Sequence, residues 1–258
     1  MKSNLYEIKY GGIPVHYRFR DPSTRWRFGK YIYRSEDDQD YINVEEDMME
    51  KGRRLYPPDS TDSFIEYCML MPLTSKELLK YHSCIFHSVS FLYKGKAWLI
   101  TAPSGIGKTT QYLNWRKTWP GEIEMINGDK PVLKLNKSRE IFVHPSPWNG
   151  KENIGNSHLS GSLGGIILLE QGPYNRVEMK MPPEILLEVF MQFLVRPDTE
   201  EEINSLISLT RTLLTGYPIW KLTNIGDTKS TGMIRETINN YLESITQLQD
   251  DGLSMEEI

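Results

Sequence analysis

The chain has 258 residues, of which 39% are apolar and 25% are charged. A chain of this composition can bury a substantial core, which excludes a disordered, collagen-like or membrane-bundle chain. Its length favours one large domain or one domain with a small appendage. The net charge is −4, but the stretch after Tyr241 holds five carboxylates without Lys or Arg, so the rest of the chain is nearly neutral. Without a basic excess, nucleic acid is not expected as a partner.

Cysteine usage and the first residues indicate the compartment. The two cysteines, Cys68 and Cys84, fit neither a CxxC pair nor a disulfide framework, so two buried free thiols are expected. The start of the sequence lacks an apolar signal region, and no run of about 18 apolar residues follows. We therefore expect a cytoplasmic protein without membrane contact.

The first sixty residues predict a hairpin followed by a charged segment. Leu5–Tyr10 and Pro14–Phe19 are rich in aromatic and β-branched residues and flank Gly11-Gly12. From Ser35 to Asp62 the chain is acidic and poor in apolar residues, which indicates an exposed linker or a charged strand pair, and a subdomain boundary. The expected parts are a β-rich N-terminal subdomain with its acidic linker over 1–62, a main domain over 63–248 and an acidic tail over 249–258.

The rest of the chain predicts strands and helices in alternation. Thr74, with Glu77 three positions later, forms a capping box that predicts the start of a short helix. The apolar runs Cys84–Tyr93 and Ala97–Thr101 predict adjacent strands joined by a tight turn. Further helices are expected near Lys108–Lys117, Pro182–Val195, Glu200–Leu214 and Asp227–Leu248, and strands near Ile123–Ile126, Val132–Leu135, Ile141–His144, Leu163–Leu169 and Pro218–Leu222.

One segment carries a specific signal for phosphate binding. Residues 102–109, Ala-Pro-Ser-Gly-Ile-Gly-Lys-Thr, match a P-loop with Ala102 where a glycine usually stands, between an expected strand and an expected helix. Its glycines allow φ > 0, so that successive N–H groups and the helix N-terminus face phosphate oxygens. Lys108 suits the β- and γ-phosphates, and the Thr109 hydroxyl suits Mg²⁺. The expected nucleotide-binding residues are Ser104, Gly105, Ile106, Gly107, Lys108, Thr109 and Thr110, against the alternative of a glycine-rich turn without a ligand.

Three other positions are weaker candidates when taken alone. A Mg²⁺-nucleotide needs a carboxylate near the loop, and Asp129 follows an expected strand, where it is either a metal ligand or a turn former. Glu152 lies in a polar loop after Trp148, and this loop is either part of a site or an ordinary surface loop with a packed tryptophan. His87 stands among apolar neighbours on an expected strand, which is typical of a half-buried histidine with satisfied hydrogen bonds.

Taken in order, these segments resemble the P-loop kinase family of HPr kinase/phosphorylase and the phosphoenolpyruvate-carboxykinase-like catalytic domains, and match best its small, mostly uncharacterised bacterial members. The resemblance runs from about Leu78 to Leu222, whereas the first seventy residues carry none. The motifs that carry it are Phe86-His87-Ser88, Thr101 to Thr110, Asn127-Gly128-Asp129-Lys130-Pro131, Pro147-Trp148-Asn149-Gly150-Lys151 and Arg196-Pro197.

The resemblance implies a mixed α+β fold, in which a mixed β-sheet with flanking helices carries the P-loop, and a main domain that is catalytic. It also implies ATP-dependent phosphoryl transfer to a hydroxyl or carboxyl acceptor. By position, Lys108 binds phosphate, Thr109 and Asp129 bind Mg²⁺, and His87 lies near the γ-phosphate. Arg196 would stabilise charge in the transition state, and Lys151 and Glu152 would face the acceptor.

One departure from the family concerns the general base. Family members commonly have two adjacent aspartates in the second motif, the first resembling the base, and Gly128 stands at that position here. Either another group such as Glu152 or His87 has taken over the role, or catalysis is weak.

The sequence therefore predicts an ATP- and Mg²⁺-dependent kinase that phosphorylates a Ser/Thr hydroxyl of a protein or peptide. The alternatives are a small-metabolite kinase of the same fold and a catalytically weak nucleotide-binding regulatory protein. Neither the identity of the acceptor nor the choice of ATP over GTP follows from the sequence, and a homo-oligomer is left open.

Overall fold

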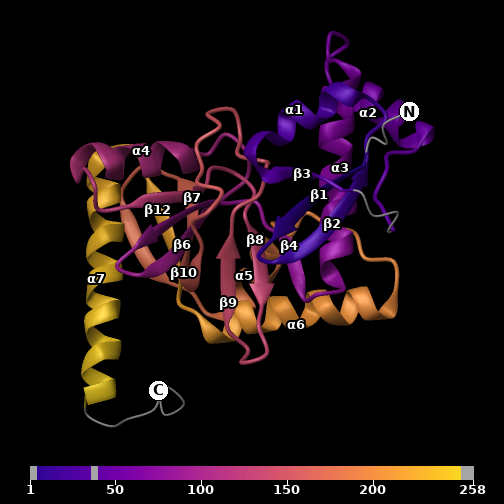
Figure 1. The fold of residues 1–258 in the computed structure, drawn as a ribbon. Helices are drawn as coiled ribbons and strands as arrows, with labels where there is room; N and C mark the ends of the chain where they lie inside the picture. Colours follow the sequence, from indigo (N-terminus) through magenta and orange to yellow (C-terminus); the bar gives the residue numbers. More distant parts are fainter. Residues whose placement is uncertain (1–4, 36–39, 251–258) are drawn as a thin grey trace.

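The computed structural model describes residues 5–35 and 40–250 of the chain. They form a mixed α+β fold with two sheets, a small one of order β2-β1-β3 and a nine-stranded one that is mixed parallel and antiparallel (Figure 1). Helices pack around the large sheet, so the expected mixed fold is confirmed at this level. Within these residues, no helix is both long enough and apolar enough to cross a membrane.

The chain begins with the expected hairpin. Strands β1 (Leu5–Tyr10) and β2 (Ile13–Arg18) pair antiparallel, and Gly11 and Gly12 between them have φ of +56° and +83°. A two-residue turn with positive φ at both positions matches the right-handed twist of the strands. Strand β3 (Ile32–Arg34) pairs with β1, after the short helices η1 (Pro22–Thr24), α1 (Arg25–Phe28) and η2 (Gly29–Tyr31).

The charged segment after Ser35 is not a linker or a strand pair throughout, because it contains helix α2 (Glu46–Leu55). Acidic side chains lie in its first turn and Arg53 and Arg54 in its last, an arrangement that favours a helix through its dipole. The run of charges is therefore the solvated side of a helix. The acidic residues 36–38 lie outside the described part of the chain.

Helix α3 (Asp62–Leu79) replaces the short helix expected after Thr74. Thr61 is its N-cap, with its side chain accepting the N–H of Phe64 at 3.3 Å. Thr74 is instead buried inside the helix, where its hydroxyl donates to the Leu70 carbonyl at 2.8 Å. Pro72 is also inside, at a cost of about 3 kcal/mol, which the burial of the apolar side of α3 offsets.

The strand expected over Cys84–Tyr93 is interrupted. Strand β4 (Ser83–Ile85) pairs with β8, whereas β5 (Val89–Tyr93) pairs with β6. Between them the Phe86 N–H donates to the Pro131 carbonyl and the His87 N–H to the Gln192 carbonyl. His87 therefore lies in a break between two strands rather than within one.

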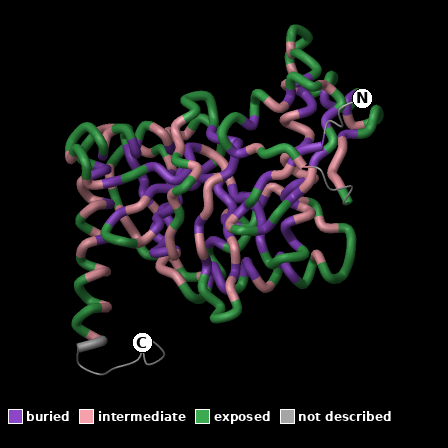
Figure 2. The backbone as a smooth tube through the Cα atoms, in the orientation of Figure 1, coloured by how far each residue is buried: buried purple, intermediate pink, exposed green. Residues whose placement is uncertain are grey.

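The centre of the large sheet is covered on both faces. Strands β6 (Lys96–Thr101) and β10 (Gly161–Gln171) run parallel, and alternate residues point into different cores. Trp98 and Ile100 join a core with helices α4 (Lys108–Thr118) and α7 (Thr228–Asp250), whereas Leu99 joins a core with α5 (Pro182–Phe190) and α6 (Glu200–Gly216). Figure 2 shows these buried strands in the interior of the molecule. The other strands are β7 (Glu124–Asn127), β8 (Val132–Leu135), β9 (Ile141–His144), β11 (Arg176–Met179) and β12 (Ile219–Asn224).

Two further differences from the expected elements are small. Helix α5 ends at Phe190 instead of Val195, because the following residues turn back to pair with the break after β4: the Leu194 N–H donates to the Ile85 carbonyl at 3.0 Å. Strand β11, which no pattern indicated, forms the edge of the sheet beside β12.

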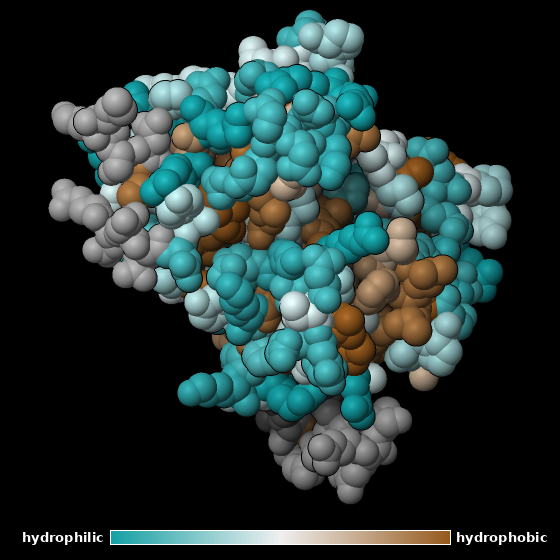
Figure 3. Space-filling model, turned by 90° about the vertical axis from the view of Figure 1, so that its right-hand side faces the viewer, coloured by the Kyte–Doolittle hydropathy of each residue, from teal (hydrophilic) through white to brown (hydrophobic). Residues whose placement is uncertain are grey.

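A third core joins the N-terminal hairpin to the large sheet through α3. It contains Tyr10 and Tyr17 of the hairpin, Leu70 of α3, Val132 of β8 and the buried Trp148. Figure 3, which views the molecule from the side of α2 and α3, shows a mostly hydrophilic face with hydrophobic groups gathered in a central hollow and in a patch at lower right. Helix α3 is thus packed between the hairpin and the segment that follows β9.

Candidate active site

The phosphate-loop motif, residues 102–109, joins β6 to α4, so the expected strand–loop–helix arrangement is confirmed. Gly105 and Gly107 have φ of +85° and +109°, and Gly107 is the N-cap of α4. Both angles disfavour a residue with a Cβ atom, which is the reason for glycine here. The N–H groups of the first turn of α4 have no partner inside the helix, and together with the helix dipole they provide a site for an anion.

Lys108 lies folded over the loop. Its ammonium group donates to the carbonyl of Ala102 at 2.9 Å and to that of Pro103 at 3.3 Å, and the residue is only 8% exposed. Burial lowers the pKa of Lys108, an effect that the charge of Asp129 partly opposes. A bound phosphate would take the place of these two carbonyl groups as the partner of the ammonium.

Asp129 is positioned by a turn at the end of β7. The Asn127 side-chain oxygen accepts the N–H of Asp129 at 2.9 Å and of Lys130 at 2.6 Å, and its amide donates to the Ser146 carbonyl at 2.9 Å. Gly128 lies inside this turn, where a Cβ atom would be 2.6 Å from the Asn149 carbonyl oxygen and 2.8 Å from that of Ile154. Gly128 is therefore required by packing rather than by a positive φ.

The Asp129 carboxylate contacts two nitrogen-bearing side chains. One oxygen lies 3.3 Å from Nε2 of His87, and the other is paired with the Lys130 ammonium. Burial by itself would raise the pKa of Asp129, but the hydrogen bond from His87 and the charge of Lys130 outweigh it and lower this pKa to about 2. At neutral pH this side chain is a carboxylate, suited to hold a cation and unsuited to donate a proton.

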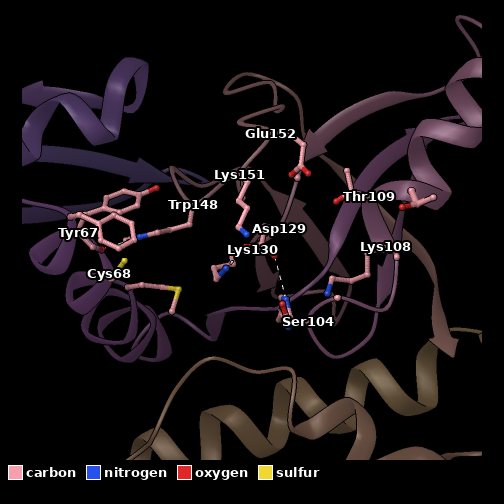
Figure 4. Close-up of a pocket in the computed structure, with 18 of the residues that line it drawn as sticks. Tyr67, Cys68, Ser104, Lys108, Thr109, Asp129, Lys130, Trp148, Lys151 and Glu152 are labelled. Carbon is pink, nitrogen blue, oxygen red and sulfur yellow. Dashed lines mark hydrogen bonds and ion pairs between the residues drawn. The ribbon is translucent and has the colours of Figure 1, made fainter. Parts of the chain in front are cut away.

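These groups line one cleft of about 660 Å³ (Figure 4). Of the residues predicted from the sequence, it brings together His87, Ser104, Gly105, Gly107, Lys108, Thr109, Thr110, Asp129, Lys151 and Glu152. Ile106 instead faces a second hollow of about 480 Å³ on the other side of the phosphate loop. Arg196 is exposed, in the segment between α5 and α6, and does not line the cleft.

Sequence reasoning missed an entire side of the cleft. Six residues form it, and we call them the apolar wall: Tyr56, Phe64, Tyr67, Cys68, Met71 and Trp148. Four of them stand at i, i+3, i+4 and i+7 along α3, a helical spacing that is visible in the sequence once the helix is known. Cys68 is a free thiol but half-buried against this cleft, so the expectation of two buried thiols holds only for Cys84.

The donors in the cleft suit a magnesium ion held mainly by phosphates. The Thr109 hydroxyl and the Asp129 carboxylate are both hard oxygen donors at this site. Within residues 5–35 and 40–250, no group of three or more His, Cys, Asp or Glu side chains is arranged as a complete metal site. Mg²⁺ commonly takes only one or two protein carboxylates and completes its shell with substrate phosphates and water.

Comparison with known proteins finds matches among solved structures only. No family model matches the chain, and no curated protein does. Among solved structures, the chain is similar to the HPr(Ser) kinase/phosphatase from Coxiella burnetii, with 13% sequence identity and a TM-score of 0.35. The likeness covers 63% of this chain and 98% of that one, and no activity follows from a similarity so remote.

Proposed function

We propose that the chain is a Mg²⁺-dependent phosphotransferase that uses a nucleoside triphosphate, ATP in the first instance, and acts on a Ser or Thr hydroxyl. One observation carries the proposal: the phosphate-loop motif and the Asp129 carboxylate, which come from different strands, line the same cleft. A phosphate cradle, a metal carboxylate and cations meet most of the requirements of phosphoryl transfer, which depends chiefly on positioning and on stabilising charge.

The residues divide the work as follows. The N-terminus of α4 and the phosphate loop bind the β- and γ-phosphates, and Lys108 turns from the Ala102 carbonyl to the phosphate oxygens. Thr109 and Asp129 would hold Mg²⁺, which supplies charge stabilisation to the phosphates when bound. With Asp129 engaged in this way, the Lys130 ammonium that now pairs with it would be available to the phosphoryl oxygens.

Glu152 is the best-placed proton acceptor for the substrate hydroxyl. Gly128 leaves the usual aspartate position without a carboxylate, and Asp129 is already paired with His87 and Lys130. Glu152 lines the cleft, is exposed, and forms no hydrogen bond or ion pair with any other described residue. His87 is the second choice, because its Nε2 already contacts Asp129.

Titration calorimetry with Mg²⁺-ATP tests the binding step. Lys108→Ala should weaken ATP binding by at least about tenfold, since a charge-assisted contact to phosphate is lost. Lys117→Ala, an exposed lysine at the other end of α4, serves as the matched control and should bind normally. Equal affinities for wild type and Lys108→Ala would refute nucleotide binding at this loop.

The transfer step needs a separate assay. Labelled ATP is incubated with the protein and a cell extract, and label is followed on peptides, on metabolites and as free phosphate. Label on peptides supports the proposal. Tight ATP binding without transfer to any acceptor supports instead a nucleotide-binding regulatory protein, the second candidate, which the missing carboxylate at position 128 favours.

A further inference from the structure

The apolar wall has no part in the chemistry proposed above, although it lines the same cleft. Phe64, Tyr67, Cys68 and Met71 form a stripe along α3 that spans about 10 Å at the rise of an α-helix. The rings of Tyr56 and Phe64 meet edge to face at 5.4 Å, and those of Tyr67 and Trp148 lie 5.7 Å apart. The side chains of the stripe remain only half-buried, so the wall faces open space.

Polar atoms on the apolar wall are already engaged. The Tyr67 hydroxyl donates to the Pro147 carbonyl at 2.9 Å, and the Trp148 indole N–H donates to the Tyr67 carbonyl at 3.1 Å. Burial raises the pKa of Tyr56 to about 12 and also raises the pKa of the Cys68 thiol, so both groups are neutral. The wall therefore offers rings, sulfur and methylene groups, and the ligand group that fits it is apolar.

The position of the wall identifies which reactant it contacts. In Figure 4, Asp129 and Lys130 lie between Tyr67, Cys68 and Trp148 on one side and Lys108 and Thr109 on the other. A γ-phosphate held between Lys108 and Asp129 would therefore have the apolar wall on its open side, from which an acceptor would approach. The rest of the nucleotide has its own space, because the second hollow adjoins the phosphate loop away from the wall.

The form of the cleft favours a peptide over a small molecule. Small-molecule sites usually enclose most of their ligand, whereas this cleft is bordered by the exposed residues Lys151 and Glu152. In an extended peptide, alternate side chains on one face are about 7 Å apart, so the stripe on α3 accommodates the side chains next to a modified residue.

We infer that the acceptor is a peptide segment that carries a bulky apolar side chain, aromatic or Met/Leu, within two residues of the phosphorylated Ser or Thr, and that the apolar wall binds this side chain. The inference rests on the proposed function. In the transfer, the bond between the γ-phosphorus and the ADP oxygen breaks, a bond to the Ser or Thr oxygen forms, and the hydroxyl proton passes to Glu152. Binding at the wall would hold the hydroxyl in line with the γ-phosphate.

A degenerate peptide library tests this inference. Seven-residue peptides with one central Ser and mixed flanking residues are incubated with the protein and Mg²⁺-ATP, and the phosphorylated peptides are sequenced. We expect Phe, Tyr, Trp, Leu or Met to be enriched at least about tenfold over Ala at one flanking position, a selectivity typical of hydrophobic pockets. In Phe64→Ala and in Met71→Ala, this enrichment should fall below about threefold.

Matched substitutions outside the cleft provide the controls. Phe190→Ala and Met191→Ala remove the same side chains from the exposed end of α5, where they are 39% and 67% exposed, and should leave the enrichment unchanged. If Phe64→Ala fails to fold because its contact with Tyr56 is lost, Met71→Ala carries the test alone.

Three outcomes would overturn the inference. The first is that the phosphorylated peptides show no preference for apolar residues beside the serine. The second is that this preference remains in both Phe64→Ala and Met71→Ala. The third is that no peptide is phosphorylated although the protein binds ATP. The last outcome leaves nucleotide binding intact and points to a small acceptor or to the regulatory protein considered above. A wild-type protein that does not bind Mg²⁺-ATP would instead refute the proposed function itself.

Discussion

Replacing Gly128 by alanine probes the turn that positions Asp129. The added Cβ atom would lie 2.6 Å from the Asn149 carbonyl oxygen and 2.8 Å from that of Ile154, where an ordinary contact is 3.4 Å or more. Both neighbours are backbone atoms, so they have to move by about 0.6–0.8 Å, and overpacking of this kind costs about 2–3 kcal/mol. For a chain of this size, we expect the melting temperature to fall by about 4–12 °C.

The same displacement should affect activity. Asn149 and Ile154 delimit the loop that carries Lys151 and Glu152, and a misplacement near 1 Å can reduce turnover by about a hundredfold. Gly128→Asp is subject to the same clash, because it also has a Cβ atom. Restoring the aspartate pair of the resembling family at this position would therefore displace the loop that the acceptor faces.

Thermal unfolding followed by circular dichroism measures the effect, with Gly216→Ala as the matched control. Gly216 ends α6, does not have a positive φ, and has no atom within 4 Å of an added Cβ. Its replacement should leave stability unchanged or raise it by about 0.5–1 kcal/mol. The steric reasoning is refuted if Gly128→Ala melts at the same temperature as Gly216→Ala.

Three further predictions concern the other site residues. Asp129→Asn should lower the unfolding free energy by about 2 kcal/mol at pH 7, since the folded pKa of Asp129, about 2, lies below its ordinary 3.8. In urea titrations, the difference in unfolding free energy between wild type and variant should disappear as the pH falls from 4 to 2. A difference that stays constant over this range would contradict the ion pairing. Glu152→Gln should reduce kcat by about 10²–10⁴-fold with ATP affinity unchanged, and a reduction below about threefold would show that another group accepts the proton. Arg196→Ala should keep turnover within about twofold in steady-state assays because its side chain is outside the cleft; a loss above about tenfold would support the role that the resemblance implies.

Features that depend on neighbouring residues in the sequence could be predicted. The hairpin around Gly11-Gly12 and the strand–loop–helix around residues 102–109 follow from short-range turn chemistry and periodicity, and the structure contains both. Asp129 was also placed correctly at the end of a strand, because a turn after an apolar run is a local pattern.

What the sequence left hidden depends on contacts between distant segments. Helix α2 looks like a charged linker until Gly52 is seen packed against Ile65, where a Cβ atom would lie 2.4 Å from that side chain. His87 looks like part of one strand, because only the hydrogen bonds to Pro131 and Gln192 reveal the break. The apolar wall combines Tyr56, which follows α2, with helix α3 and the segment after β9, and no pattern along the chain brings these together.

Because of helix α3, the two sides of the cleft come mostly from different parts of the chain, and one side can be exchanged without the other. Ile65, Leu70 and Leu78 anchor it in the third core, which it shares with the N-terminal hairpin, while the phosphate loop and Asp129 come from later segments of the chain. Recombination within the first eighty codons would thus exchange most of the apolar wall and keep the phosphate chemistry. Trp148 is the exception, since its indole N–H bonds to the Tyr67 carbonyl, so a functional chimera would need an N-terminal part that accepts this indole.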